Sequence, residues 1–257
     1  MNTFAENVKE RGTVEGRSTP ARPRGRPRGR TPQGERTRQH LYEVAIWLIA
    51  TRGWQQTTLR DVAEQAGVSV GLLYRYFPSK RAVVLALYDS LSAEYATRAA
   101  SMGSGRWRAR ALYALRTSLD VLGPHRATLA ALVPVLVGDA EEGLFAPGTA
   151  FSRLRVQAVF VQAVVEASDA PRGPVAAALG RLLYLLHLAV ILWWLLDRSP
   201  GQRATSALLK LLEQALRLAA PVLRIPGVPG LVTALDEVVG DALLGQPSPA
   251  THASQLE

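Results

Sequence analysis

Apolar residues recur at three- and four-residue steps along most of the chain, which is the spacing of one face of an α-helix. Stretches rich in glycine and proline interrupt this pattern near residues 102–105, 123–124, 138–148, 169–174, 198–202 and 225–230. Between these breaks the pattern predicts helices over residues 79–100, 107–121, 126–137, 152–167, 175–197, 204–223 and 231–244. The sequence therefore predicts an all-α fold.

The segment from Thr58 to Lys80 predicts two short helices joined by a tight turn. Thr58 and Asp61 have the spacing of a capping box, and Ser69 is placed to cap the second helix. Gly67 lies between the helices, where a residue with positive φ can end the first one. The inward-facing apolar positions are Leu59, Val62, Ala63, Ala66, Leu73 and Phe77. This pattern is typical of a helix-turn-helix, although an ordinary pair of antiparallel helices would share it.

The residues after the turn favour a nucleic-acid partner. Tyr74, Arg75 and Tyr76 place polar groups on the face opposite the apolar one. Lys80 lies in the first turn of the next helix, where a cation opposes the helix dipole unless an anion is near. A DNA phosphate would supply that anion.

This segment resembles the DNA-binding domain of the TetR family of bacterial transcription regulators. The match covers residues 37–87, from an entry helix that ends in TRGW at 51–54 to the run TLRDVAEQAGVSVGLLYRYFPSKRAVVLAL at 58–87. The resemblance implies an all-helical, TetR-like homodimer. Its N-terminal helix-turn-helix domain would span residues 35–85, and a helical ligand-binding and dimerisation domain would span 86–245, followed by a disordered tail over 246–257.

The resemblance also implies roles for individual residues. Early residues of the second helix would face base edges: Val70, Gly71, Leu72 and, further on, Arg75. Arg75 has the strong hydrogen-bonding capacity in this set, whereas Val70 and Leu72 could contact thymine methyl groups. Phosphate contacts would come from Thr58, Tyr74, Tyr76 and Lys80. Tyr74 could instead pack partly into the core.

Positive charge is concentrated before the first predicted helix. The chain of 257 residues has a formal net charge of +9, and residues 20–38 carry seven arginines against one glutamate, which is +6 of that total. These residues are Arg22, Arg24, Arg26, Arg28, Arg30, Arg36, Arg38 and Glu35. Residues 1–34 show no helical periodicity, so we expect a disordered basic arm. Such an arm favours a polyanionic partner.

Within the arm, the sequence RGRPRGR at residues 24–30 resembles an AT-hook, which lies extended in the minor groove of A·T-rich DNA. Arg24, Arg26, Arg28 and Arg30 would be drawn to the negative potential of a narrow groove. Glycine permits close backbone approach and proline favours an extended path. A tail that binds phosphates without sequence preference is the alternative, and either arrangement would make DNA binding stronger and more sensitive to salt.

The most hydrophobic segment spans residues 175–197 and includes LLYLLHLAVILWWLL at 182–196. Its uninterrupted apolar stretch is about fifteen residues, shorter than the roughly twenty that a membrane span needs, and His187 lies inside it. We therefore expect a helix that is buried on all sides, by its own domain and by a partner subunit. The family resemblance implies that this helix and the one over 204–223 form a four-helix bundle in a homodimer.

A ligand pocket is expected among the middle helices. Their aromatic and ionisable residues are the candidates: Trp107, Tyr113, His125, Phe151, Phe160, Tyr184, His187 and Trp194. Each of these side chains could instead serve only in core packing. Because ligand pockets are mostly apolar with few polar anchors, we expect a largely apolar ligand.

The sequence offers little for an enzyme. It contains no cysteine, its four histidines lack metal-ligand spacing, and it has no glycine-rich phosphate loop. Asp139, Glu141 and Glu142 form an ordinary polar loop. We therefore expect neither a catalytic site nor a cofactor nor a metal, and the start of the chain does not resemble a secretory signal peptide.

Taken together, these features predict a cytoplasmic transcriptional repressor that a small, largely apolar ligand releases from a palindromic DNA operator. The alternative is an architectural protein that binds DNA mostly without sequence preference, through the arginine-rich arm.

Overall fold

The computed structural model describes residues 31–138 and 143–244. The four arginines of the predicted minor-groove arm, the predicted tail and the loop residues Asp139, Glu141 and Glu142 lie outside these ranges. Regular secondary structure in the described residues is entirely helical, as predicted. The α-helices are α1 (Pro32–Arg52), α2 (Leu59–Gln65), α3 (Val70–Tyr76), α4 (Lys80–Ala99), α5 (Trp107–Leu122), α6 (Arg126–Ala131), α7 (Val133–Gly138), α8 (Ala150–Val165), α9 (Val175–Leu196), α10 (Arg203–Val222) and α11 (Val228–Leu244).

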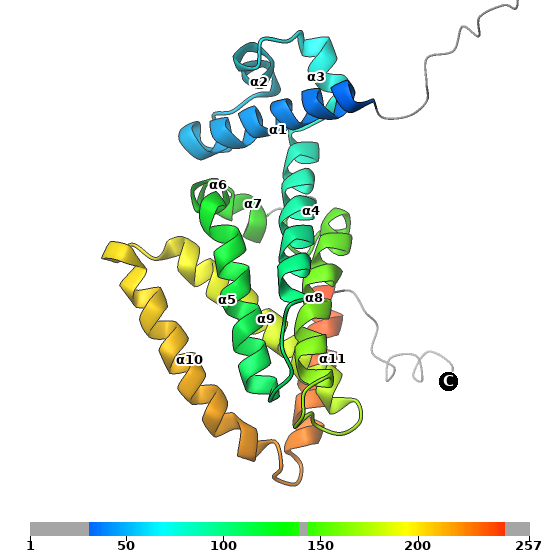
Figure 1. Ribbon diagram of the computed structural model, residues 1–257, viewed down its shortest axis with the longest axis vertical. Helices are drawn as coiled ribbons and strands as arrows, with labels where there is room; N and C mark the ends of the chain where they lie inside the picture. Colours follow the sequence, from blue (N-terminus) through cyan, green and yellow to red (C-terminus); the bar gives the residue numbers. More distant parts are fainter. Residues whose placement is uncertain (1–30, 139–142, 245–257) are drawn as a thin grey trace, which may run out of the picture.

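Two hydrophobic cores meet on α4. Helices α1 to α3 form a small unit at one end of the molecule, and α5 with α8 to α11 form a larger bundle at the other (Figure 1). Leu41, Leu73, Phe77 and Val83 belong to the core of the small unit, whereas the next residue, Val84, belongs to the core of the bundle. Helix α4 therefore runs from one core into the other and is part of both.

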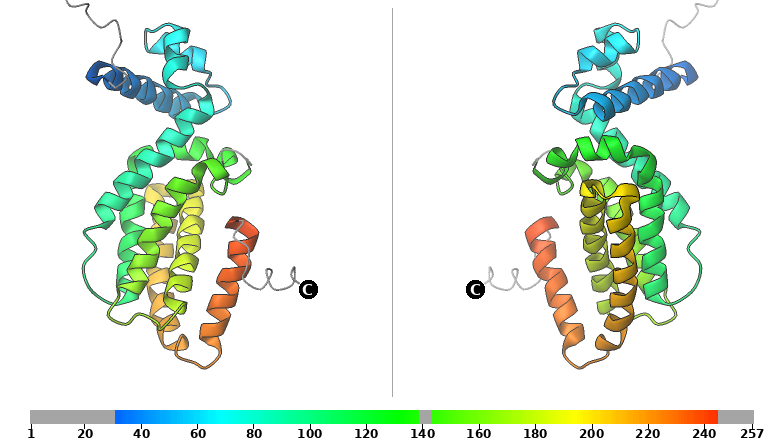
Figure 2. Two further views of the ribbon diagram at one scale, coloured as in Figure 1. Left: turned by 90° about the vertical axis from the view of Figure 1, so that its right-hand side faces the viewer. Right: turned by 90° about the vertical axis from the view of Figure 1, so that its left-hand side faces the viewer.

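Helices α8 and α9 form the centre of the bundle. They approach so closely that a Cβ atom at Gly180 would lie 2.5 Å from the Cα atom of Val161 and 3.0 Å from the carbonyl oxygen of Phe160. Helices α4 and α5 pack against α8, while α11 packs against α9. In the views of Figures 1 and 2, α9 lies between α10 and α11.

Helix α9 is long and apolar enough to cross a membrane by length and composition alone. Its packing identifies it instead as a core helix, because Leu183, Tyr184 and His187 are buried against neighbouring helices of the bundle. The expectation that α9 is buried on all sides includes a partner subunit, and the single subunit alone leaves one side of the helix uncovered. Trp193 and Leu196 are 49% and 58% exposed on its outer side.

Two predicted boundaries need correction. Helix α1 begins at Pro32, so the predicted arm is three residues shorter than expected: the hydroxyl of Thr31 accepts a hydrogen bond from the amide of Gly34 at 3.1 Å, and Pro32 suits the first helical position. The single helix predicted over 126–137 is divided into α6 and α7 at Leu132. Pro134 explains the division, since it lacks the amide that a continuous helix requires.

Candidate nucleic-acid interface and buried pocket

Local hydrogen bonds fix the turn between α2 and α3. The hydroxyl of Thr58 accepts from the amide of Asp61 at 3.2 Å, and the carboxylate of Asp61 accepts from the amide of Thr58 at 2.8 Å, which completes the predicted capping box. These hydrogen bonds hold the pKa of Asp61 below its usual value. Gly67 has a φ of 66°, and Ser69 accepts from the amide of Leu72 at 3.2 Å. The predicted caps and turn are therefore confirmed.

Helix α3 presents one side to solvent and buries the other. Leu73 and the adjoining Phe77 are 0% and 1% exposed and anchor the helix in the core of the small unit. The predicted base-facing and phosphate-contacting residues on this helix are exposed or half-buried: Val70, Gly71, Leu72, Tyr74, Arg75 and Tyr76. Tyr74 is 49% exposed, so its ring is available at the surface rather than packed in the core. These side chains form the candidate nucleic-acid interface.

Lys80 has a structural partner that the sequence did not reveal. Its ammonium group donates hydrogen bonds to the carbonyl oxygens of Trp54 and Thr57 at 2.7 and 3.0 Å, and it lies 4.0 Å from the centre of the Trp54 ring. Lys80 thus ties the start of α4 to the segment before α2. A phosphate at this position would share the ammonium group with those two carbonyls.

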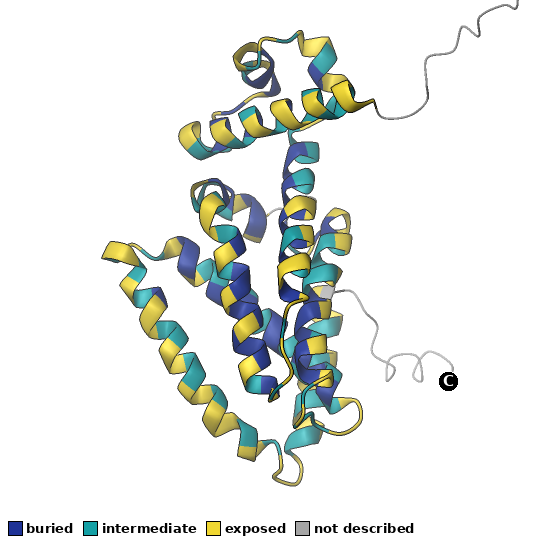
Figure 3. Cartoon of the chain, viewed as in Figure 1, coloured by how far each residue is buried: buried dark blue, intermediate teal, exposed yellow. Residues whose placement is uncertain are grey.

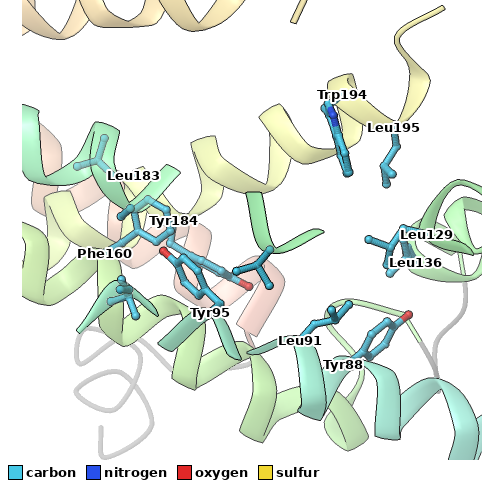
Figure 4. Close-up of a cluster of buried hydrophobic side chains, with 14 of the residues drawn as sticks. Tyr88, Leu91, Tyr95, Leu129, Leu136, Phe160, Leu183, Tyr184, Trp194 and Leu195 are labelled. Carbon is cyan, nitrogen blue, oxygen red and sulfur yellow. The ribbon is translucent and has the colours of Figure 1, made fainter. Parts of the chain in front are cut away.

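A cavity of about 130 Å³, partly open to solvent, lies in the larger bundle. Its walls come from α4 to α9, with the loop before α8 closing one side. The side chains that line it are mostly apolar: Tyr88, Leu91, Tyr95, Leu122, Leu129, Leu136, Leu144, Val156, Tyr184, Leu188, Ile191 and Leu195, with the polar residues Ser92, Ser118, Thr149, Ser152, Arg153 and His187. Figure 4 shows how Tyr95, Phe160 and Tyr184 gather at one end of this core, with Leu129, Leu136 and Leu195 further along.

The cavity wall contains two polar atoms without a hydrogen-bond partner in the described structure. The hydroxyl oxygen of Ser118 lies 2.7 Å from Nε2 of His187, but Nδ1 of His187 and the hydroxyl group of Tyr95 are buried and unbonded. The Tyr95 and His187 rings stack with their centres 6.2 Å apart. Because a buried polar group without a partner costs free energy, these two atoms are suited to bind a polar group of a ligand.

Burial keeps these groups uncharged. It lowers the pKa of His187 to about 3, and it raises the pKa values of Tyr95 and Tyr184 well above their usual value. These three side chains are therefore neutral near pH 7 and offer hydrogen bonds without a charge, whereas Arg153 brings a positive charge to the cavity lining.

The structure separates the predicted pocket residues into two groups. Tyr184 and His187 line the cavity, Phe160 packs directly against His187 with ring centres 4.8 Å apart, and Trp194 is buried in the same core. The other four predictions are wrong for this cavity: Trp107, Tyr113, His125 and Phe151. Phe151 is 69% exposed and Tyr113 is 38% exposed, because each lies on the outer side of its helix. Trp107 is buried away from the cavity, and half-buried His125 lies in the turn before α6.

Sequence reasoning missed Tyr88, Tyr95 and Ser118. Tyr95 follows Leu87 and Leu91 at four-residue steps, and a hydroxyl group on that apolar face is the signal that the sequence offers. Ser118 gave no signal of its own, since its position beside His187 depends on the packing of α5 against α9.

Comparison with known proteins agrees with this arrangement. The family model described as "Bacterial regulatory proteins, tetR family" matches residues 41–87. The HTH-type transcriptional regulator EthR of Mycolicibacterium smegmatis is 29% identical over 187 residues, which cover 70% of this chain and 83% of EthR. Residues 41–87 therefore match the DNA-binding domain of the TetR family, and the chain is similar to EthR over most of its length.

Other proteins extend this similarity. The transcriptional regulator TtgR of Pseudomonas putida is 42% identical over 59 residues, which is 23% of this chain and 28% of TtgR. A TetR transcriptional regulator from Nitrosomonas europaea has the same fold, with a TM-score of 0.52 and 21% identity over 72% of this chain and 98% of its own. EthR and TtgR are HTH-type transcriptional regulators, and this chain shares sequence with both of them.

Proposed function

We propose that this chain is a TetR-family regulator, a homodimeric repressor that a small, largely apolar ligand releases from a palindromic operator in the cytoplasm. The observation that carries the proposal is the cavity with the unbonded polar atoms of Tyr95 and His187, lined by α4, the helix that also contributes to the core of the small unit. A cavity of this kind is the usual form of a small-molecule site.

On the DNA side, α3 would enter the major groove. Arg75 would read a base edge, Val70, Gly71 and Leu72 would lie against the groove floor, and exposed Tyr74 would help to hold the backbone. Thr58, Tyr76 and Lys80 would add phosphate contacts, although the Thr58 hydroxyl and the Lys80 ammonium also bond within the subunit. In a dimer through α9 and α10, two α3 helices about 34–36 Å apart would contact two half-sites, which is why we propose a palindromic operator.

The ligand would be small and uncharged where it meets the deep end of the cavity. The volume of about 130 Å³ is below the roughly 300 Å³ of ordinary drug-sized pockets. The walls supply apolar contact, while Tyr95 and His187 can bond one hydrogen-bonding group such as a carbonyl or hydroxyl. An ionised group would find no charged partner in Tyr95 or His187, whereas Arg153, which also lines the cavity, could pair with an anionic group.

Two routes connect the cavity to the small unit. Tyr88, Leu91 and Tyr95 of α4 line the cavity, and Val83 of the same helix packs beneath α3. Helix α6 packs against α1 and contributes Leu129 to the cavity wall. A ligand that favours one arrangement of α4 and α6 would change the placement of α3, so that ligand and DNA affinity are reciprocally coupled.

The side chain of Arg126 stiffens the second route. Its guanidinium group donates to the carbonyl oxygens of Trp194 and Asp197 at 2.9 and 2.8 Å, at the end of α9. Helix α6 is thereby bonded to α9 while it packs against α1. Movement of the cavity wall formed by α9 would be transmitted through this contact.

The proposal can be tested by selecting bound DNA from a random pool and measuring the release of that DNA by candidate small molecules. Tyr95→Phe removes an unbonded hydroxyl group from the cavity, so it should leave operator affinity unchanged and raise the ligand concentration needed for release about tenfold. Tyr113→Phe is the matched control, because Tyr113 lies outside the cavity, and it should behave as the parent protein. Binding without sequence preference at moderate salt would contradict the proposed function.

A further inference from the structure

The outer face of α11 carries an apolar stripe that its own subunit leaves uncovered. Leu231, Leu235 and Val238 are 70%, 53% and 66% exposed, and Ala242 is also exposed. Positions separated by four, three and four residues lie along one side of a helix. In soluble proteins, contiguous exposed apolar surface of this kind marks an interaction site.

An ion pair fixes which side of α11 faces the subunit. Nε of Arg181 on α9 donates to both carboxylate oxygens of Asp236 at 2.9 and 3.0 Å, and the Asp236 side chain is only 12% exposed. Consecutive residues are rotated by about 100° around a helix, so Leu235 is turned away from the contact that Asp236 makes. The apolar stripe therefore points outward while the polar side chain points toward α9.

Helix α10 also carries an apolar stripe that its own subunit leaves uncovered. Leu211, Leu218 and Val222 are 62%, 74% and 44% exposed, and Ala215 completes a stripe with the same spacing as on α11. Thr205 is the buried residue of this helix. Helix α9 lies between α10 and α11 in Figure 2 and exposes Trp193 and Leu196, so three consecutive helices carry exposed apolar side chains. Figure 3 shows the exposed side of α10 in yellow.

The area of α10 alone is too small for a stable dimer. A helix of 20 residues is about 30 Å long and about 10 Å wide, so one face covers roughly 300 Å². Standard interfaces bury about 800 Å² on each partner. A dimer that uses α10 needs the faces of neighbouring helices, and α11 offers a further uncovered apolar stripe beside α9.

We propose that α11 is part of the homodimer interface and that its stripe packs against a second copy of this chain. The proposal rests on the dimer through α9 and α10 that belongs to the proposed function. It adds α11 to that interface, so that α9, α10 and α11 of each subunit contact the partner subunit.

The first test measures dimer dissociation by analytical ultracentrifugation of the full chain. Leu231→Lys with Leu235→Lys should weaken the dimer by at least about 30-fold, as expected for the loss of a central apolar anchor. Glu237→Lys is the matched control, because residue 237 is exposed and lies about 160° around the helix from Leu235. It should leave the dimer unchanged. Circular dichroism checks that each variant keeps its helices, and Leu231→Ala with Leu235→Ala should act in the same direction.

The second test measures directly whether a second subunit covers the stripe on α11, and it does not depend on disrupting the fold. Because the chain has no cysteine, Val238→Cys and Glu237→Cys each introduce a single thiol. At a concentration where 90% of the chain is dimeric, labelling of Val238→Cys should slow about tenfold relative to the monomer, since only the monomer reacts. Labelling of Glu237→Cys should not depend on protein concentration.

The α10 variant Leu218→Lys distinguishes the proposed dimer through α9 and α10 from the added role of α11 in that dimer. If it dissociates the dimer while the α11 variants leave both affinity and labelling unchanged, the α9–α10 dimer stands and the role of α11 is refuted. If the parent chain is monomeric at all concentrations, the dimer itself fails, and with it the proposed function. Loss of the dimer in both sets of variants, with concentration-dependent labelling of Val238→Cys, supports the inference.

Discussion

Substitution of Gly180 by alanine should destabilise the larger bundle. Its new Cβ atom would lie 2.5 Å from the Cα atom of Val161, and restoring an ordinary carbon–carbon contact of about 3.5–4.0 Å requires α8 and α9 to separate by about 1 Å. The opposing atoms belong to the backbone, so no side-chain rotation relieves the overlap. Overpacking costs about 1–3 kcal/mol, and the better helix propensity of alanine offsets up to about 1 kcal/mol of it.

The net loss should be about 1–2 kcal/mol, which lowers the melting temperature by roughly 2–8 °C for a protein of this size. Thermal and urea unfolding, followed by circular dichroism, would measure the change. Gly230→Ala is the matched control, since it makes the same substitution in α11 with no atom within 4 Å, and it should be neutral or slightly stabilising. An equal effect of the two substitutions would refute the inferred close packing of α8 and α9.

The Gly180 variant also has a functional consequence. His187 and Leu188 of α9 line the cavity, as does Val156 of α8, so a wider spacing between these helices changes the cavity as well as the core. We expect the ligand concentration needed for DNA release to change in this variant, whereas operator affinity in the absence of ligand should stay close to that of the parent.

Three further predictions concern charge. Burial lowers the pKa of His187 to about 3, below its ordinary value near 6.5. Between these two pH values the imidazole is protonated in the unfolded chain but neutral in the folded one. Stability contributed by neutral His187 is present above about pH 6.5 and falls on acidification toward pH 3, by up to about 1.4 kcal/mol per pH unit, and His187→Gln should flatten this slope in urea unfolding. Arg75→Ala should weaken selected operators by about 1–3 kcal/mol and relax one base position in a repeated selection; an unchanged sequence preference would exclude Arg75 as a base reader. Deletion of residues 1–30 should lower affinity and reduce its salt dependence while specific recognition survives, and loss of all specificity in a binding titration would favour the architectural alternative.

The helix-turn-helix could be predicted from sequence because its geometry depends on neighbours. The hydrogen bonds of Thr58 with Asp61, and of Ser69 with Leu72, each join residues three positions apart. The positive φ of Gly67 is likewise a local property. Such features are visible in a short stretch of sequence, and the same holds for most helix boundaries.

The cavity could not be predicted in the same way. Ser118 and His187 are 69 positions apart in the sequence, and their contact depends on how α5 and α9 are rotated against each other. Aromatic character alone selected Phe151 and Tyr113, which lie on the outer sides of their helices. The side of a helix that faces a cavity is set by the whole bundle, so composition identifies candidates but not their direction.

The position of α4 in two cores bears on how such regulators can be recombined. Val83 and Val84 are consecutive, yet each supports a different core, so no linker separates the part that would meet DNA from the part that would sense the ligand. A chimaera that joins this sensor to another reader must therefore be cut within a helix and must match the side chains on both of its faces. Exchanging the two halves at a loop would remove from one of the two cores the side chains that α4 contributes to it.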